Sequence, residues 1–286
     1  MERFIKDVES KAKNRKFEMI SVKKLTDKKI IESHFRKNIN LNLYQIGDLD
    51  EFFWKYTEWF GLYVGTELKQ IILIYKGTDL PVMIALCDTS ENSISEMKTL
   101  ISEIKKDLPD NFYSHLSKGV SEVLEYNYEP GHHGTYLKMT LKKENLITFA
   151  EDRNIKRLNV TDIEIVKEFY YKSYPDNWFD KRMLETGKYF GYFFDNKIAG
   201  ISGIHVYSHL YKVAVLGNIT TDPEFRGQSI CKKVTSELCK DLFETVDVIG
   251  LNVHSENSAA IKSYKNIGFE ITDEYEEIMF EKSLNS

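Results

Sequence analysis

The pattern of apolar and polar positions along the chain predicts a succession of strands and helices. Short apolar runs that end at turn residues are typical of strands, and apolar residues at intervals of three and four are typical of amphipathic helices. In the first half of the chain, a helical start precedes a meander of short strands. The expected strands lie at residues 62–64, 70–75, 81–86, 111–115 and 136–141, and the expected helix lies at residues 94–106.

The second half of the chain repeats this order of elements. Helices are expected at residues 161–171, 183–187, 227–243 and 259–267, and strands at residues 189–194, 198–205, 211–221, 248–253 and 276–281. A meander followed by strand, helix and strand predicts an α/β (α+β) fold with a mixed sheet, not a doubly wound one. The similar order in both halves predicts two tandem domains, residues 1–148 and 149–286, which meet in a polar stretch, KENLITFAEDRNI.

The charge of the chain argues against a nucleic-acid partner. The 286 residues, about two domains in length, include 39 basic and 44 acidic side chains, which gives a formal charge of −5. Residues 1–37 are the basic part, with 12 basic and 6 acidic side chains. A nucleic-acid or membrane-surface arm is one interpretation of this start, but acidic and apolar residues interrupt it, which favours a solvated helix face. We therefore expect neither nucleic acid nor membrane as a partner.

The cysteines and the first residues of the chain predict a cytoplasmic protein. Cys87, Cys231 and Cys239 show neither a CxxC pair nor metal-ligand spacing. An odd number of such cysteines indicates reduced thiols. The opening residues, MERFIKDVES, lack the apolar core of a signal peptide, and the apolar run at residues 71–75 is far too short to span a bilayer of ~30 Å. We expect no metal site.

The stretch that follows the expected strand at residues 211–221 is the first candidate for a chemical role. Pairing should stop at Asp222-Pro223, because proline cannot donate to a sheet ladder. The turn EFRGQS then leads into a helix. A helix N-terminus presents unpaired backbone N–H groups and the positive end of the helix dipole, which suit a pyrophosphate, and Arg226 adds a positive charge. Alone, this pattern also describes an ordinary connection with a surface arginine.

A second motif, NSAAIKSYKNIGF, follows the expected strand at residues 248–253. Tyr264 comes seven residues after Asn257, about two helical turns, so both side chains lie on one side of a helix. The small side chains of Ala259 and Ala260 permit close packing, and Gly268 is a natural helix-ending residue. Tyr264 can also be interpreted as a core aromatic residue whose hydroxyl lies at the surface, with no functional role.

Together, ITTDPEFRGQSICKKV (residues 219–234) and NSAAIKSYKNIGF (residues 257–269) resemble the acetyl-CoA-binding core of the GNAT N-acetyltransferase superfamily. The family's pyrophosphate signature, Arg/Gln-x-x-Gly-x-Gly/Ala, aligns on Arg226, Ser229 and Cys231. The resemblance covers residues 217–269 directly and most of residues 151–286 by strand order. It implies two tandem GNAT-like mixed-sheet domains, of which the N-terminal one is divergent and lacks the cofactor motif.

The resemblance implies an acetyl-CoA-dependent N-acetyltransferase that transfers the acetyl group directly to an amine of a small molecule, amino acid or peptide. Ile219, Thr220 and Thr221 would pair with the pantetheine amides, and a backbone N–H near Thr221 would stabilise the oxyanion. Asn257 would bind the cofactor near its thiol end. Tyr264 would be the general acid, since a phenol pKa near ~10 is close to that of a thiol. The residues implied for the pyrophosphate are Arg226, Gly227, Gln228, Ser229, Ile230 and Cys231.

Two residues depart from the family pattern. Ser229 carries a Cβ and a hydroxyl where the family usually has glycine, which is costly if this position needs a positive φ. Cys231 is small enough for a first helical turn and is not expected to act as a nucleophile. No general base is evident. His205 and His209 flank the third strand of the second half, Glu224 precedes the turn, and a water relay would make a base unnecessary.

Two other hypotheses remain open. A non-catalytic acyl-CoA-binding sensor or interaction module would bind the cofactor without acetylating any amine. An aminoacyl-tRNA-dependent peptidyl transferase shares the tandem architecture, but it needs a basic surface that only residues 1–37 offer. The dense aromatic residues at positions 52–60 are interpreted as core. The acidic residues at positions 273–277 would favour a cationic acceptor.

Overall fold

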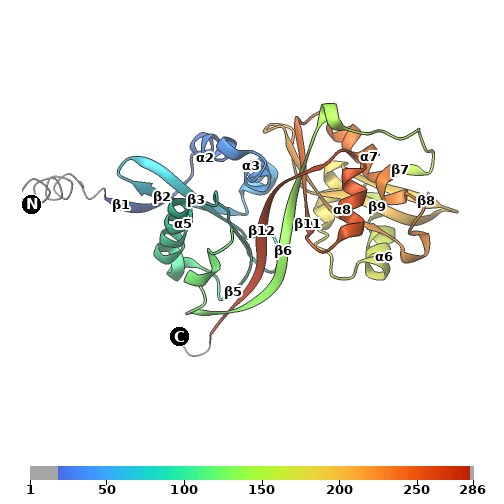
Figure 1. The fold of residues 1–286 in the computed structure, drawn as a ribbon. Coiled ribbons are helices and arrows are strands. Elements are labelled where there is room, and N and C mark those ends of the chain that lie inside the picture. Colours follow the sequence, from blue (N-terminus) through green and yellow to red (C-terminus); the bar gives the residue numbers. More distant parts are fainter. Residues whose placement is uncertain (1–18, 284–286) are drawn as a thin grey trace, which may run out of the picture. The chain divides into compact units, whose positions relative to one another are not determined.

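The structure, a computed structural model, describes residues 19–283. It divides into two compact units, each built from separate parts of the chain (Figure 1). Among the described residues, unit 1 comprises residues 19–27, 58–131 and 279–283, and unit 2 comprises Lys28–Thr57 and His132–Ile278. The expected helical start and about half of the basic stretch at residues 1–37 lie outside the described residues. Compact units and ancestral domains need not coincide, so the expected domain boundary between residues 148 and 149 stays a prediction.

Unit 1 combines a sheet with one long helix. Its strands are β1 (Ile20–Lys24), β2 (Thr57–Val64), β3 (Glu67–Tyr75), β4 (Val82–Ala85) and β5 (Asn111–Leu116), hydrogen-bonded in that order. Strands β4 and β5 are parallel, whereas β1 pairs with β2 and β3 pairs with β4 in antiparallel fashion. Helix α5 (Glu91–Ile104) begins where the Ser90 side chain accepts a hydrogen bond from the Ser93 N–H. On its apolar face Met97, Ile101 and Ile104 are buried and Ile94 is half-buried.

Unit 2 holds the remaining strands, except for residues 128–131 and 279–282, which belong to unit 1. They are β6 (Tyr128–Lys142), β7 (Ile155–Leu158), β8 (Tyr189–Phe194), β9 (Lys197–Ser208), β10 (Val213–Thr221), β11 (Val248–His254) and β12 (Glu270–Lys282), and their order is β12-β6-β11-β10-β9-β8-β7. Strands β10 and β11 are parallel, while β11 with β6 and the pairs from β10 to β7 are antiparallel. The predicted mixed α/β sheet is therefore confirmed.

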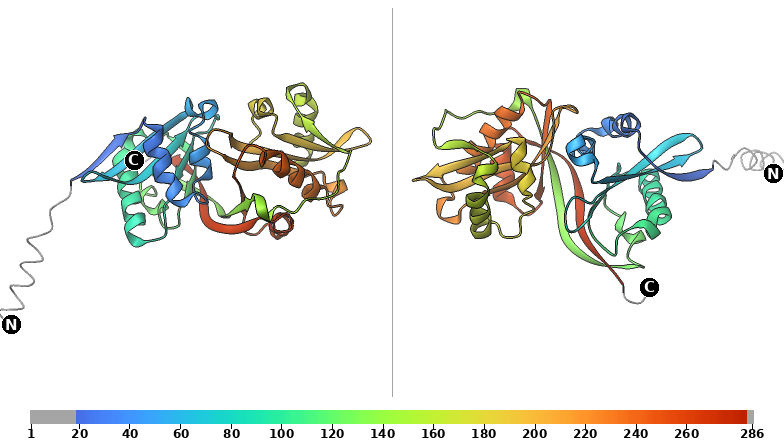
Figure 2. Two further views of the ribbon diagram at one scale, coloured as in Figure 1. Left: turned by 90° about the horizontal axis from the view of Figure 1, so that it is seen from above. Right: turned by 180° about the vertical axis from the view of Figure 1, so that it is seen from behind.

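Helices cover both faces of the unit 2 sheet. The helical elements are α6 (Ile163–Ser173), the 3-10 segment η6 (Lys181–Thr186), α7 (Ile230–Leu242) and α8 (Ser258–Lys265). Helices α6 and α7 lie on opposite faces (Figure 2). Gly200 on β9 gives α7 its close approach, because a Cβ there would fall 2.7 Å from the Ile230 side chain. This packing fixes where the N-terminus of α7 meets the sheet.

Residues 28–57 pack within unit 2, although they come early in the chain. They form α2 (Lys28–Phe35), α3 (Leu43–Gly47) and α4 (Glu51–Trp54). Two glycines bring α3 onto the sheet. A Cβ at Gly47 would fall 2.0 Å from Val206 on β9, and a Cβ at Gly250 on β11 would fall 2.3 Å from Leu43. Side chains of α3 therefore lie directly over β9, β10 and β11.

The structure corrects several expected boundaries. The helix expected at residues 227–243 begins only at Ile230, because Gly227 and Ser229 have left-handed backbone conformations, with φ of 78° and 63°. The expected hairpin turn consists of Asp195 and Asn196, both with positive φ, as a type I′ turn requires. Strands β6 and β12 are longer than expected. The sequence pattern missed β1, α2, α3, α4 and β7. No helix within residues 19–283 is both long enough and apolar enough to cross a bilayer.

Candidate active site

Strands β10 and β11 separate along their length. Their last paired residues are Leu216 and Leu251. Beyond this point β10 continues to Thr221 beside β9, and β11 continues to His254 beside β6. The facing edges of the two strands are therefore not paired with each other past Leu216. Such an opening, which we call the splay, can accept an extended amide chain as an added strand.

A bulge at Asn218 shapes the β10 side of the splay. Asn218 has a φ of 54°, and the register with β9 shifts between Gly217 and Thr220. Two buried tyrosines hold this conformation. The Tyr170 hydroxyl on α6 donates to the Asn218 carbonyl at 2.7 Å, and the Asn218 side-chain amide donates to the Tyr189 hydroxyl at 3.1 Å. The bulge is thus fixed from the α6 face of the sheet.

The turn after β10 is anchored by a buried carboxylate. Asp222 accepts a hydrogen bond from the Glu224 N–H at 3.0 Å and an ion pair from Lys172 at 2.9 Å. Burial alone would raise the pKa of Asp222, but Lys172, the Glu224 N–H and Arg226 together lower it. Asp222 therefore stays ionised and fixes the start of the turn, as the sequence position of Pro223 predicts.

The segment from Arg226 to Ser229 forms an exposed loop that leads into the N-terminus of α7. A Cβ added at Gly227 would meet nothing within 4 Å. Ser229 precedes the first helical residue and its side chain makes no capping hydrogen bond. The first N–H groups of α7 have no partner within the helix, and together with the helix dipole they form an anion-binding end. Arg226 is exposed beside it, and its guanidinium donates to the Thr221 carbonyl at 3.4 Å.

The second motif begins at the N-terminus of α8, directly after β11. The Asn257 side chain caps this helix by accepting a hydrogen bond from the Ala260 N–H at 3.1 Å. Asn257 thus has a structural role besides the predicted cofactor contact. Gly268 ends the motif with a φ of 111°, and a Cβ there would fall 2.0 Å from the Asn145 carbonyl oxygen. Both observations explain the residue types at these positions without reference to a ligand.

Tyr264 lies on α8 in a buried setting and is 7% exposed. Burial raises the pKa of Tyr264 well above its usual value, and Cys231, Tyr174 and Cys239 raise it further. The Cys231 thiol on α7 also has a raised pKa because of burial. Tyr264 therefore stays protonated over the physiological range, but its hydroxyl is a weaker acid than the phenol with a pKa near ~10 that the resemblance implies. Cys231 stays a thiol, which agrees with the view that it is not a nucleophile.

Three residues beside the splay were not assigned to the site by sequence reasoning. His205 on β9 lies over Gly217, where a Cβ would fall 1.8 Å from the imidazole ring. Burial lowers the pKa of His205 to about 4, so the ring is neutral at pH 7. The Tyr44 ring on α3 lies 6.3 Å from this imidazole, and the Lys138 ammonium on β6 lies 5.5 Å from the Tyr44 ring centre. The sequence signal for His205 was its flanking position, whereas Tyr44 and Lys138 carried none.

The remaining candidate bases are distant from this chemistry or exposed. His209 is exposed in the turn after β9. Glu224 is exposed and lies 3.9 Å from Lys172. In the part of the chain that the structure describes, no three His, Cys, Asp or Glu side chains form a group that could hold a metal ion. The three cysteines are free.

The family comparison agrees with this geometry. Residues 144–269 match the family model described as "Acetyltransferase (GNAT) family". The match to the GNAT acetyltransferase family is therefore shown for residues 144–269. The matched range contains the splay, the loop at residues 226–229 and both motifs. None of the curated protein sequences matches the chain significantly.

Solved structures share the fold at low sequence identity. A Drosophila protein superposes with a TM-score of 0.70 at 11% identity, over 93% of this chain and 99% of that one. A GNAT-family acetyltransferase from Colwellia psychrerythraea gives 0.53 at 16% identity, over 92% and 100%. A tandem GNAT protein from the clavulanic acid biosynthesis pathway gives 0.55 at 9% identity, over 91% and 98%. The tandem protein fits the predicted two-domain GNAT architecture.

Proposed function

We propose that this GNAT protein is an acetyl-CoA-dependent N-acetyltransferase that transfers the acetyl group directly to a small amine. The observation that carries the proposal is the splay, which leads at its β10 end into a loop and a helix N-terminus. In this arrangement one ligand can pair its amides with Ile219, Thr220 and Thr221 and place its phosphates at the start of α7. Acetyl-CoA has this combination of groups.

The exposed loop at residues 226–229 binds the pyrophosphate in this proposal. Arg226 supplies a guanidinium, and the backbone N–H groups of residues 227–231 supply directed donors. No side chain of residues 227–229 is needed for this, because the contacts come from the backbone. The open space around Gly227 suits a close approach of phosphate oxygens.

The chemical step needs an oxyanion donor and a proton donor. The amine nitrogen attacks the thioester carbonyl, and backbone N–H groups near Thr221 stabilise the oxyanion. The C–S bond then breaks, and the leaving thiolate takes a proton from Tyr264, whose raised pKa keeps the hydroxyl protonated until that moment. The proton lost by the amine restores the tyrosine through water. Asn257, whose side-chain oxygen caps α8, would bind the cofactor near its thiol end.

Isothermal titration with acetyl-CoA tests the donor site. We expect Arg226→Ala to weaken binding about tenfold, because one charge-assisted contact to phosphate is lost. Lys106→Ala removes an exposed cation of unit 1 and is the matched control. Absence of acetyl-CoA binding by the unmodified protein would exclude the proposal.

Thiol release in the presence of amine acceptors tests the chemistry. We expect Tyr264→Phe to lower kcat at least 100-fold with little change in acetyl-CoA affinity, whereas Tyr171→Phe, on the exposed face of α6, leaves kcat unchanged. Unchanged turnover in Tyr264→Phe would remove the general-acid role alone. Tight cofactor binding without transfer to any amine would instead favour the non-catalytic sensor.

A further inference from the structure

Lys138 is a buried cation beside the splay. Its side chain is 3% exposed, and it forms no ion pair with a carboxylate of the described residues. The ammonium lies 4.8 Å from the ring centre of Tyr275 and 5.5 Å from that of Tyr44. Ring faces compensate a buried ammonium only in part, because they accept no directed hydrogen bond from its three N–H groups. The site therefore has unused donor capacity.

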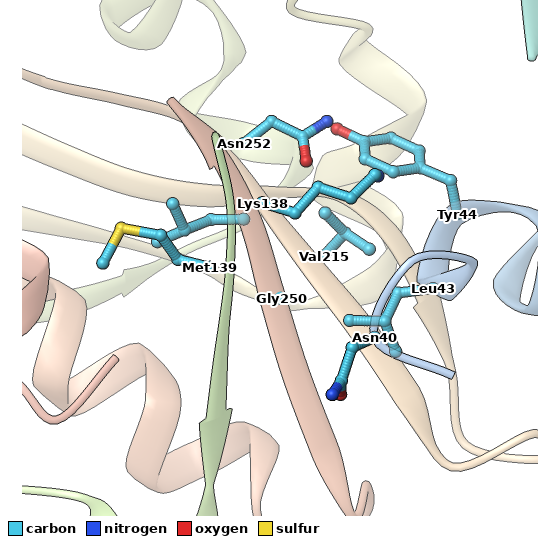
Figure 3. Close-up of a pocket in the computed structure, with 9 residues that line it drawn as sticks. Asn40, Leu43, Tyr44, Lys138, Met139, Val215, Gly250 and Asn252 are labelled. Carbon is cyan, nitrogen blue, oxygen red and sulfur yellow. The ribbon is translucent and has the colours of Figure 1, made fainter. Parts of the chain in front are cut away.

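The position of Lys138 relates it to the reaction site. It pairs across the sheet with Asn252, the first β11 residue beyond the last β10–β11 pair. Figure 3 shows the Lys138 side chain extending toward the Tyr44 ring, with Asn252 and the Tyr44 hydroxyl pointing toward one another. Together with Asn40 and other residues of unit 2, they line a narrow crevice that is partly open to solvent.

The size and charge of the crevice restrict what can bind there. The space that a water molecule can occupy in the crevice is about 10 Å³, which is room for about one water, so any group larger than a carboxylate is excluded. Two carboxylates, Asp273 and Glu277, lie close enough to act on Lys138, and Glu277 accepts a hydrogen bond from the Tyr275 hydroxyl. Their negative charge disfavours a dianion such as phosphate. A single carboxylate satisfies the ammonium, and the acidic side chains suit a neighbouring ammonium group of the same ligand.

Resting on the proposed acetyl transfer, we propose that the acceptor is an α-amino acid whose carboxylate binds Lys138 in this crevice. The amino group, one carbon away from the carboxylate, then faces the splay where the thioester lies. Burial lowers the pKa of Lys138 to about 8, and a bound carboxylate restores the charged form. The residues of α3 complete the crevice, which gives residues 28–57 a part in acceptor selection.

The test compares each of the twenty amino acids with its own carboxamide, by thiol release from acetyl-CoA. For the preferred side chain we expect kcat/KM to be at least tenfold higher for the acid than for the amide. Lys138→Met should abolish this preference by lowering kcat/KM for the acid to the level measured for the amide. The variant should fold, because replacing a buried unpaired charge with an apolar side chain of similar size is often stabilising. Lys142→Met, at an exposed position of the same strand, is the matched control and should keep the preference.

A binding measurement separates this proposal from the proposed function. Each acid and each amide is added to the CoA-saturated protein, and the melting temperature is recorded for the unmodified protein and for Lys138→Met. The crevice assignment is supported if acids, but not amides, raise the melting temperature of the unmodified protein and if Lys138→Met loses this increase. This result supports it even if no amine is acetylated. Acetylation of amides as fast as acids, or an acid preference that persists in Lys138→Met, overturns it while leaving acetyl transfer intact. Absence of any acid-specific rate or shift also overturns it.

Discussion

Replacing Ser229 with glycine should stabilise the protein. Ser229 holds a φ of 63° at the start of α7, and its side chain makes no capping hydrogen bond. The left-handed conformation costs a residue with a Cβ roughly 1–2 kcal/mol, whereas glycine adopts it freely. Glycine loses about 0.5–1 kcal/mol of this gain through the greater freedom of its unfolded chain. The net expectation for Ser229→Gly is an increase of about 0.5–1 kcal/mol in the free energy of unfolding.

Urea unfolding followed by circular dichroism measures this difference, and Ser229→Ala is the control. Alanine keeps the Cβ and loses only the hydroxyl, so its midpoint should stay close to that of the unmodified protein. Acetyl-CoA affinity should be equal or higher in Ser229→Gly, because the backbone N–H groups stay in place and the Cβ no longer borders the phosphate site. A lower midpoint for Ser229→Gly than for Ser229→Ala would show that the Cβ is not strained at this position, and the strain argument would be wrong.

Three further predictions concern the splay. Gly217→Ala should lower the free energy of unfolding by about 1–3 kcal/mol, because the added Cβ would fall 1.8 Å from the His205 ring. An unchanged urea midpoint would mean that the ring moves away without cost. Tyr170→Phe removes the 2.7 Å hydrogen bond to the Asn218 carbonyl and should lower the free energy of unfolding by about 1 kcal/mol. It should also weaken acetyl-CoA binding, as measured by titration. Full affinity would show that the bulge does not need this bond. Burial lowers the pKa of His205 from 6.5 to about 4, so the unfolded chain takes up a proton at a higher pH than the folded one, and stability is lost as the pH falls from 6.5 toward 4. His205→Gln should reduce this loss in the free energy of unfolding by at most about 3 kcal/mol, and the part due to His34 should remain. Melting curves recorded between pH 6.5 and pH 4 measure the difference. An unaltered pH profile would contradict the burial of His205.

Local patterns were sufficient to predict the elements that carry the family motifs. Strand β8 lies at the expected residues, and β11 and α8 begin or end within two residues of their expected bounds. These elements are long or strongly patterned, and their capping and turn residues are local features. The start of α7 was predicted too early, because apolar spacing does not record that Gly227 and Ser229 have positive φ. The expectation that a Cβ at Ser229 is costly if φ is positive does apply, because this residue has a φ of 63°.

The sequence by itself determined the family chemistry, because its signature is local. Arg226, Asn257 and Tyr264 stand in short motifs whose spacing follows from one turn and one helix, and their cofactor contacts stay predictions. Only the tertiary structure decided what lies opposite them. It places Tyr44 of α3, Lys138 of β6 and His205 of β9 together beside the splay, although these residues are far apart in the chain. A sequence pattern carries no record of such contacts, because they arise when strands pair and when Gly47 and Gly250 let α3 approach the sheet. The residues predicted to bind acetyl-CoA can therefore be found from local sequence motifs, whereas the residues that line the crevice at Lys138 come together only through tertiary packing.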